Sequence, residues 1–217
     1  MTFPAPVAAQ IIISLTSAVA YLLFYVSKPP SLNRTVIKTL SIASLAALAV
    51  ILEGPVLLVV ALALSALGDL FISRDGDAAF LAGLGAFLAA HIAYVALFWG
   101  VVGGIGALSP LVAIAFAVYA LAMLRWLWPH LAEMKIPVSA YVAVIYAMGV
   151  TAAAAPVGLW PIIAGAALFV ISDSVLSAET FVFKDQPRPW TAPVIWSTYY
   201  ASQVLIAAAF LCPLFAS

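Results

Sequence analysis

The stretch LSALGDLFISRDGD, residues 64–77, begins as continuous apolar sequence and ends as a charged loop. Asp69 lies inside the apolar part, four residues before that part ends at Ser73. The role of a carboxylate in such a position depends on whether the apolar run is surrounded by water or by lipid. The composition of the whole chain answers that question.

The chain has 217 residues, of which 67% are hydrophobic and 7% are charged. Its mean hydropathy of +1.23 is far above what a soluble core requires and is typical of multi-span membrane proteins. The formal net charge of zero gives no indication of nucleic acid as a partner. The longest connection, at about 179–191, is too short for a soluble domain, so we expect residues 1–217 to form a single integral membrane domain.

Apolar runs long enough to cross a hydrocarbon core of roughly 30 Å predict eight transmembrane helices. These runs are apolar on all faces, whereas the strands of a membrane barrel alternate apolar and polar residues. The predicted fold class is therefore all-α, a polytopic membrane helical bundle. We expect the spans, of which the second and sixth are short, at about 5–26, 36–52, 55–73, 79–101, 107–128, 137–154, 158–178 and 192–215.

The basic residues predict the topology. All eight lie in or beside the odd-numbered connections, whereas the even-numbered connections and both tails have none: Lys28, Arg34, Lys38, Arg74, Arg125, Lys135, Lys184 and Arg188. By the positive-inside rule, the odd connections are cytoplasmic and both termini face the non-cytoplasmic side. We expect a multi-pass integral protein of a bacterial-type inner (cell) membrane.

A short internal similarity relates the two halves of the chain. LGDLFIS (67–73) aligns with ISDSVLS (171–177), because each acid follows a small residue and precedes a serine by four positions. This similarity is consistent with a parallel 4+4 repeat. At about 1.5 Å per residue, Asp69 and Asp173 each lie roughly 6–10 Å inside the predicted cytoplasmic boundary.

Polar side chains recur on one face of five predicted spans, as the spacing of three or four residues requires. They are Ser65, Asp69 and Ser73; Asp173 and Ser177, flanked by Ser172 and Ser174; His91 and Tyr94; Tyr199 or Tyr200 with Gln203; and Lys38 with Ser41. Together they predict a water-accessible pocket in the cytoplasmic half of the bundle.

Structural roles remain open for most of these residues. Serines allow helices to approach closely, boundary tyrosines anchor spans at the interface, Lys38 can extend to the headgroups, and His91 can be a satisfied core residue. An ionisable group within a span costs a few kcal/mol and by default marks function, which favours Asp69 and Asp173 as site residues. The remaining acids are expected to be solvated loop charges: Glu53, Asp75, Asp77, Glu133, Glu179 and Asp185.

Several kinds of active site are not supported. A zinc hydrolase needs three or more protein ligands, and the chain has only two histidines, His91 and His130, and one cysteine, Cys212. There is no G-x-S-x-G nucleophile motif. Two carboxylates in a partly apolar pocket remain, and such a pair can divide the tasks of general acid and general base. We therefore predict no metal and no cofactor.

Four segments carry a resemblance to a known family. SALGDLFI (65–72), FLAGLGAFLAAHIAYVALF (80–98), GAALFVISDSVLSAETF (165–181) and STYYASQVLI (197–206) contain G-D, F-x-x-x-H-x-x-Y, S-D-x-x-L and Y-Y-x-x-Q in that order. This combination resembles the YhhN family, whose animal members are lysoplasmalogenases. The resemblance implies an eight-span membrane hydrolase that cleaves the vinyl ether bond of a lysophospholipid to a fatty aldehyde and a glycerophospho-base.

The resemblance also implies roles for individual residues. The family's motif positions fall on Lys38, Asp69, His91, Tyr94, Asp173, Tyr200 and Gln203. We expect catalysis by Asp69, Asp173 and His91, and substrate binding by Lys38, Tyr94, Tyr199, Tyr200, Gln203 and Ser172. Vinyl ether hydrolysis needs a neutral general acid, a negative charge beside the developing cation, and a base for water, which two aspartates can supply. The substrate phosphate is expected near Lys38, Arg74 or Arg188.

A proton-coupled small-molecule transporter is the alternative, because buried acids and a mid-membrane histidine also form proton relays. Transporter sites often lie at broken helices. No Gly/Pro pair interrupts the third or the seventh predicted span, which favours the hydrolase.

The predicted orientation can be tested by cysteine labelling in a Cys212→Ser background. A cysteine placed beside Lys184 should be shielded from an impermeant thiol reagent in intact cells, because the seventh connection is predicted to be cytoplasmic. A cysteine placed in the C-terminal tail should be labelled. The reverse pattern would overturn the orientation.

Overall fold

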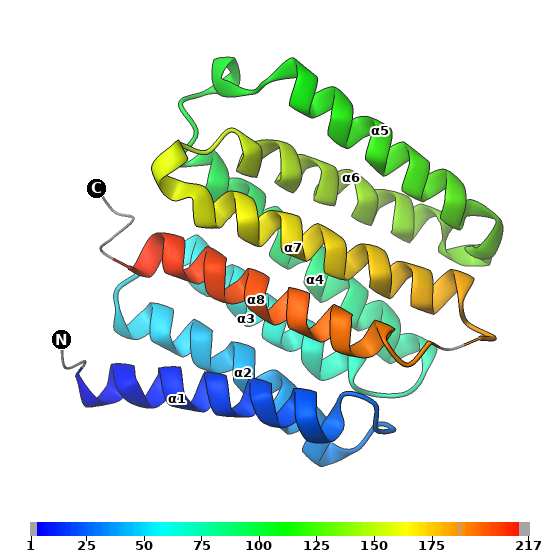
Figure 1. Cartoon of the computed structure of the whole chain (residues 1–217), viewed down its shortest axis with the longest axis horizontal. Coiled ribbons are helices and arrows are strands. Elements are labelled where there is room, and N and C mark those ends of the chain that lie inside the picture. The colour runs from blue at the N-terminus through cyan, green and yellow to red at the C-terminus, as the bar shows by residue number, and fades with distance from the viewer. Residues whose placement is uncertain (1–3, 187, 213–217) are drawn as a thin grey trace.

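The computed structural model describes residues 4–186 and 188–212, which form eight α-helices and no strand (Figure 1). The helices are α1 (Ala5–Ala20), α2 (Leu32–Ile51), α3 (Val56–Ile72), α4 (Asp77–Trp99), α5 (Pro110–Leu127), α6 (Lys135–Ala153), α7 (Trp160–Ser177) and α8 (Thr191–Leu211). A π-helical turn extends α1 (Tyr21–Tyr25) and another extends α7 (Ala178–Val182). Short 3-10 turns lie at Ile105–Ala107, Trp128–His130, Ala132–Met134 and Val157–Leu159.

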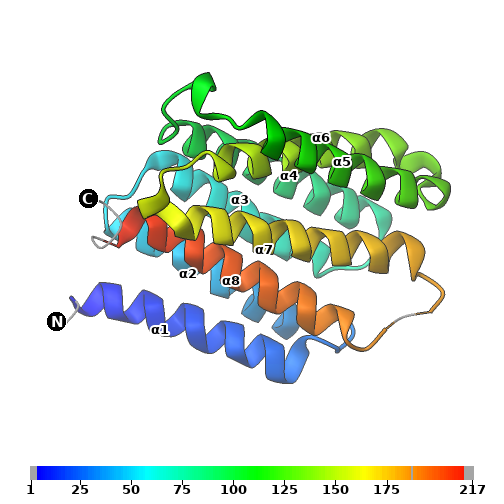
Figure 2. The same ribbon diagram turned by 45° about the horizontal axis from the view of Figure 1, so that its top comes forward.

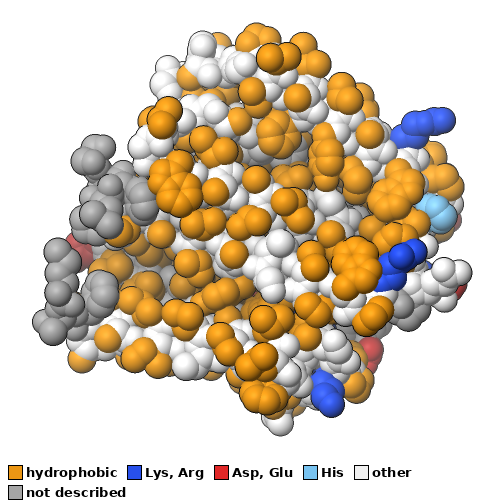
Figure 3. All heavy atoms as spheres, in the orientation of Figure 1, with side chains coloured by type: hydrophobic (Ala, Val, Ile, Leu, Met, Phe, Trp, Pro, Cys, Tyr) orange, Lys and Arg blue, Asp and Glu red, His pale blue; other side chains and the backbone are white. Residues whose placement is uncertain are grey.

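Successive helices run in opposite directions, so the two ends of the described chain lie at the same end of the bundle (Figures 1 and 2). The Lys and Arg side chains visible in Figure 3 lie at the opposite end. This arrangement agrees with the one-sided distribution of basic residues in the sequence. Which end faces the cytoplasm stays a prediction.

Within the described residues, seven helical segments are long and apolar enough to cross a membrane, which confirms a polytopic α-helical bundle. The exception is α3, whose 17 residues extend about 26 Å. The expectation that the second and sixth spans are short was wrong, since α2 has 20 residues and α6 has 19. Both begin among basic residues that precede the apolar run, because a helix continues beyond the stretch that lies in lipid. Residues 213–215 of the predicted eighth span lie outside the described residues.

Two glycines permit close helix contacts near the centre of the bundle. A Cβ at Gly165 of α7 would lie 2.7 Å from the Ile206 side chain and 3.0 Å from the Ser202 carbonyl oxygen of α8. A Cβ at Gly68 of α3 would lie 2.6 Å from the ring of Phe87 on α4. Small residues at such crossings are the usual means of helix association in membranes. Gly68 thereby allows the Phe87 ring to pack closely against α3.

Helix α5 lies at the edge of the bundle (Figure 1). Its outer face is exposed, including Leu111, Val118 and Leu121, and the main buried hydrophobic cluster contains no residue of α5. Helices α3 and α7 run in the same direction (Figure 1), and each carries an aspartate near its C-terminal end. The polar residues of the two helices therefore lie toward one end of the molecule.

Candidate functional site

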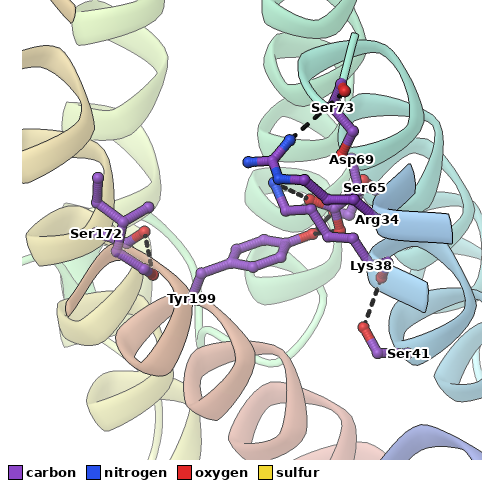
Figure 4. Close-up of polar contacts among 9 residues, drawn as sticks. Arg34, Lys38, Ser41, Ser65, Asp69, Ser73, Ser172 and Tyr199 are labelled. Atoms are coloured by element: carbon purple, nitrogen blue, oxygen red, sulfur yellow. Dashed lines mark hydrogen bonds and ion pairs between the residues drawn. The ribbon is translucent and has the colours of Figure 1, made fainter. Parts of the chain in front are cut away.

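Asp69 is completely buried and is held by two side chains from other helices. Its Oδ1 lies 3.0 Å from Lys38 Nζ of α2, and its Oδ2 accepts a 2.8 Å hydrogen bond from the Tyr199 hydroxyl of α8. Figure 4 shows Tyr199 and Lys38 converging on Asp69. A charge in a low-dielectric interior persists only when it is paired and hydrogen-bonded, and Asp69 meets both conditions.

The Lys38 ammonium is positioned by aromatic rings as well as by Asp69. Its Nζ lies 5.9 Å from the ring centre of Tyr21 and 5.8 Å from that of Trp196, distances at which a cation is attracted to the face of a ring. The Trp196 indole N–H donates to the Ala18 carbonyl oxygen at 3.1 Å. These contacts fix the ammonium inside the bundle, so Lys38 is more than a residue extending to the membrane surface.

Asp173 belongs to a second cluster, formed with α4 and α6. Its Oδ2 accepts a 2.9 Å hydrogen bond from the Tyr141 hydroxyl and lies 3.3 Å from His91 Nε2. His91 Nδ1 lies 2.6 Å from the carbonyl oxygen of Phe87. Because a carbonyl can only accept, the hydrogen of a neutral His91 is on Nδ1. Tyr141 and His91 therefore approach the same carboxylate oxygen of Asp173.

Two cavities meet at Asp173. The first, called here the polar cavity, has a volume of about 110 Å³ and is lined by Arg34, Lys38, Asp69, Asp173, Glu179 and Tyr199, among others. The second, the apolar cavity, is lined by Phe116, Tyr119, Met123, Tyr141, Ile145 and Phe181, together with Asp173. Ile72, Phe87 and Leu176 also line both. Asp173 is therefore the carboxylate on the boundary between a polar and an apolar space.

Of the remaining predicted binding residues, Ser172 lines a cavity, whereas Tyr94, Tyr200 and Gln203 line neither of the two. Ser172 lines the polar cavity and donates to the Ile195 carbonyl oxygen at 3.0 Å. Tyr94 donates a hydrogen bond to Gln203 Oε1, and both side chains are completely buried. The Tyr200 hydroxyl contacts Ser14 Oγ at 2.9 Å. Since Ser14 donates to the Ser41 carbonyl oxygen, Tyr200 is the donor and links α8 to α1.

Three residues near the cavities were not among the predicted site residues. Tyr141 contacts Asp173, and Arg34 and Glu179 line the polar cavity. Tyr141 lies six residues into α6 from its basic end, at a depth comparable with that of Asp173, so a search for polar groups at equal depth would have found it. Glu179 was expected to be a solvated loop charge, but the π-helical turn after α7 holds it, half-buried, at the cavity.

Among the described residues, no group of three or more His, Cys, Asp or Glu side chains is placed to hold a metal ion. Two pairs of side chains with opposite character lie at the cavities or directly behind their walls. Lys38 pairs with Asp69, and His91 pairs with Asp173. Such an arrangement can hold a proton, a fixed negative charge and water within a few side chains of one another.

The Lys38 and Asp69 pair can be tested by its effect on stability. Lys38→Met should destabilise the purified protein by about 3–5 kcal/mol, because it leaves a buried carboxylate without its partner. The double variant Lys38→Met/Asp69→Asn should recover part of that loss. Thermal unfolding in detergent measures both effects. A Lys38→Met variant as stable as the wild type would show that the pair is not buried as described.

Comparisons with known proteins agree with this arrangement of residues. The family model described as the YhhN family matches residues 33–210. A Mycobacterium tuberculosis protein named lysoplasmalogenase is 34% identical over 169 residues, covering 70% of this chain and 59% of that protein. The human protein named lysoplasmalogenase TMEM86B is 36% identical over 156 residues, covering 64% of this chain and 60% of that protein. Human lysoplasmalogenase TMEM86A is 31% identical over 211 residues, covering 88% and 83%.

No solved structure matches the chain at a significant level. The matched segment is less than two thirds of the mycobacterial relative's length. The similarity therefore shows the family to which this chain belongs but does not by itself show its activity. The family model covers most of the chain and includes Lys38, both buried aspartates, His91 and Gln203. The chain therefore belongs to the YhhN family.

Proposed function

We propose that the chain hydrolyses the vinyl ether bond of lysoplasmalogen-type lysophospholipids, releasing a fatty aldehyde and a glycerophospho-base. Relatives that match most of this chain are named lysoplasmalogenases. The observation that carries the proposal is the position of Asp173 on the wall of both cavities. A single-chain lipid has a polar and an apolar part, and the vinyl ether joins them.

This division supports the following proposed position of the substrate. Its hydrocarbon chain lies in the apolar cavity between α4, α5, α6 and α7, and its glycerophosphate lies in the polar cavity beside Lys38. The bond between them then lies next to Asp173. The polar cavity is large enough for several water molecules, which hydrolysis requires.

The reaction begins with proton transfer to carbon. Asp173 acts as the general acid and passes its carboxyl proton to the outer alkene carbon of the vinyl ether, and the positive charge is delocalised as an oxocarbenium ion. The Asp69 carboxylate, fixed by Lys38 and Tyr199, supplies negative charge in the cavity and accepts a proton from the attacking water. The resulting hemiacetal collapses to the aldehyde and the glycerol hydroxyl. Two carboxyl groups divide acid and base work in this way in glycosidases.

Tyr141 positions the general acid. Its hydroxyl donates to Asp173 Oδ2, and its ring lies edge-on to the His91 ring with centroids 5.2 Å apart. These contacts orient the Asp173 carboxyl group toward the boundary between the cavities. Tyr94 and Gln203 bond to each other in the core and line neither cavity, so they need not touch the substrate.

Purified protein in detergent should release fatty aldehyde from an alkenyl lysophospholipid and none from the matching saturated-ether lipid, which has no alkene to protonate. Asp69→Asn and Asp173→Asn should each lower the rate at least about 10²-fold, the usual scale for losing a general acid or base. His91→Gln should cost less, because Asp173 keeps its carboxyl group. Asp185→Asn, a change at an exposed loop acid, is the matched control.

Cleavage of an ester-linked control lipid at a similar rate would identify an ordinary lysophospholipase and contradict the proposal. A different result would support the transporter alternative. If the wild type yields no aldehyde from any alkenyl lipid, yet liposomes containing it take up protons with a solute and the two Asn variants do not, the hydrolase proposal is wrong.

A further inference from the structure

The apolar cavity is too small to enclose a whole lipid chain. Its volume is about 60 Å³. A group of the size of water or methylene needs about 10–15 Å³ of such a space, so the cavity holds about the first four to six carbons of a chain. A membrane lipid chain spans one leaflet, which is half of a hydrocarbon core roughly 30 Å thick. Most of the chain must therefore lie beyond the cavity.

Helix α5 forms the outer wall of this cavity and is weakly held. It lies at the edge of the bundle (Figure 1), where it packs mainly against α6 and makes a smaller contact with the π-helical turn after α7. Leu127, at the basic end, is the only buried residue of α5, a helix that lies wholly within the described residues. Parts of a protein with few buried apolar contacts open most easily. The part of α5 far from Leu127 can therefore move away from α7 at low cost.

A hydrogen bond between Tyr119 and Ser174 links α5 to α7 at this wall. The Tyr119 hydroxyl lies 2.5 Å from Ser174 Oγ, and Ser174 donates its own hydrogen to the Val170 carbonyl oxygen at 2.6 Å, so Tyr119 is the donor. Both side chains line the apolar cavity, and Tyr119 is 40% exposed. A hydroxyl within a span needs a polar partner, but such bonds between membrane helices add only modest stability. The link is therefore easily broken.

The gap that this link closes continues the path from Asp173. Ser174 follows Asp173 in α7, and both residues line the apolar cavity. The exposed surface nearby is apolar and includes Val118 of α5 and Ile171 of α7. A chain that begins beside Asp173 and passes between Tyr119 and Ser174 would reach lipid without crossing a polar surface.

We infer that the hydrocarbon chain of the substrate enters and leaves sideways from the bilayer, through a lateral opening between α5 and α7 that Tyr119 and Ser174 close when no chain is bound. The inference rests on the proposed function, since the chain is that of its substrate. The first few carbons of the bound chain lie in the apolar cavity, and the remainder lies in lipid. The site therefore accepts long chains without enclosing them.

Bridging the lateral opening tests this route. In a Cys212→Ser background, Tyr119→Cys and Ser174→Cys are joined by a short bis-thiosulfonate linker, which a reducing agent removes. In the purified full chain, the bridge should lower kcat/KM at least about tenfold for a hexadecenyl lysophospholipid, because its chain must pass between the helices. The butenyl analogue fits within the cavity and should be hydrolysed as before. The reducing agent should restore the rate, and each single-cysteine variant, treated in the same way, is the matched control.

Removal of the Tyr119 hydroxyl should have the opposite effect. Tyr119→Phe should raise kcat/KM for the hexadecenyl lipid about threefold, through KM, because the bound chain no longer has to break a hydrogen bond between helices. The value for the butenyl analogue should not change. Val118→Ala, at an exposed residue beside Tyr119, is the matched control. An equal change for both chain lengths, or a loss for the long chain, would mean that Tyr119 only shapes the cavity and would overturn the inference.

Binding of lipids that cannot be hydrolysed separates this inference from the proposed reaction. Titration calorimetry compares a hexadecyl ether lysophospholipid with the same lipid carrying a pyrene group at the chain end. The wild type should bind both equally, because the chain end lies outside the protein, and the bridge should weaken both. That pattern, without aldehyde release from any alkenyl lipid, would support the lateral opening and reject the hydrolase. Aldehyde release from the hexadecenyl lipid that the bridge does not slow would overturn the lateral opening alone, as would much weaker binding of the pyrene lipid.

Discussion

The buried ion pair between Lys38 and Asp69 is the interaction on which the site depends. A carboxylate inside a span is costly, and the protein offsets that cost by bringing three helices to one point, with Lys38 from α2, Asp69 from α3 and Tyr199 from α8. Each of these groups would be an unsatisfied charge or dipole without the others. The pair therefore fixes both the arrangement of these helices and the position of the polar cavity between them.

The second buried acid, Asp173, has a different environment from Asp69, and this difference suggests that the two acids have different chemical roles. Asp69 faces the ammonium group of Lys38, whereas Asp173 faces the imidazole of His91, a side chain that can donate or accept a hydrogen bond. One acid is thus suited to carry a fixed charge and the other to exchange a proton. Of the two buried aspartates, Asp173 alone lines the apolar cavity, which is consistent with the proposed proton transfer at the point where a hydrocarbon chain would begin.

The sequence predicted the helical bundle and the main acids because lipid makes strong demands on composition. Asp69 and Asp173 were identifiable because an acid is rare within an apolar run. The sequence did not predict the features that depend on contacts between helices. Tyr200 shares a helix with Tyr199, yet it bonds to Ser14 on α1, and a helical pattern cannot tell which neighbour each face meets. Glu179 follows the apolar run and was assigned to a loop, whereas the π-helical turn returns it to the cavity.

The central claim is that Asp173 delivers a proton to carbon at the boundary of the two cavities, and isotope labelling tests it most directly. Hydrolysis of an alkenyl lysophospholipid is run in D₂O, and the aldehyde is reduced at once with borohydride so that later exchange is prevented. The account predicts a single deuterium at carbon 2 of the resulting alcohol, in one stereochemical configuration, because the proton comes from one side chain. An alcohol without deuterium at carbon 2 would mean that the bond breaks without protonation of carbon and would contradict the account.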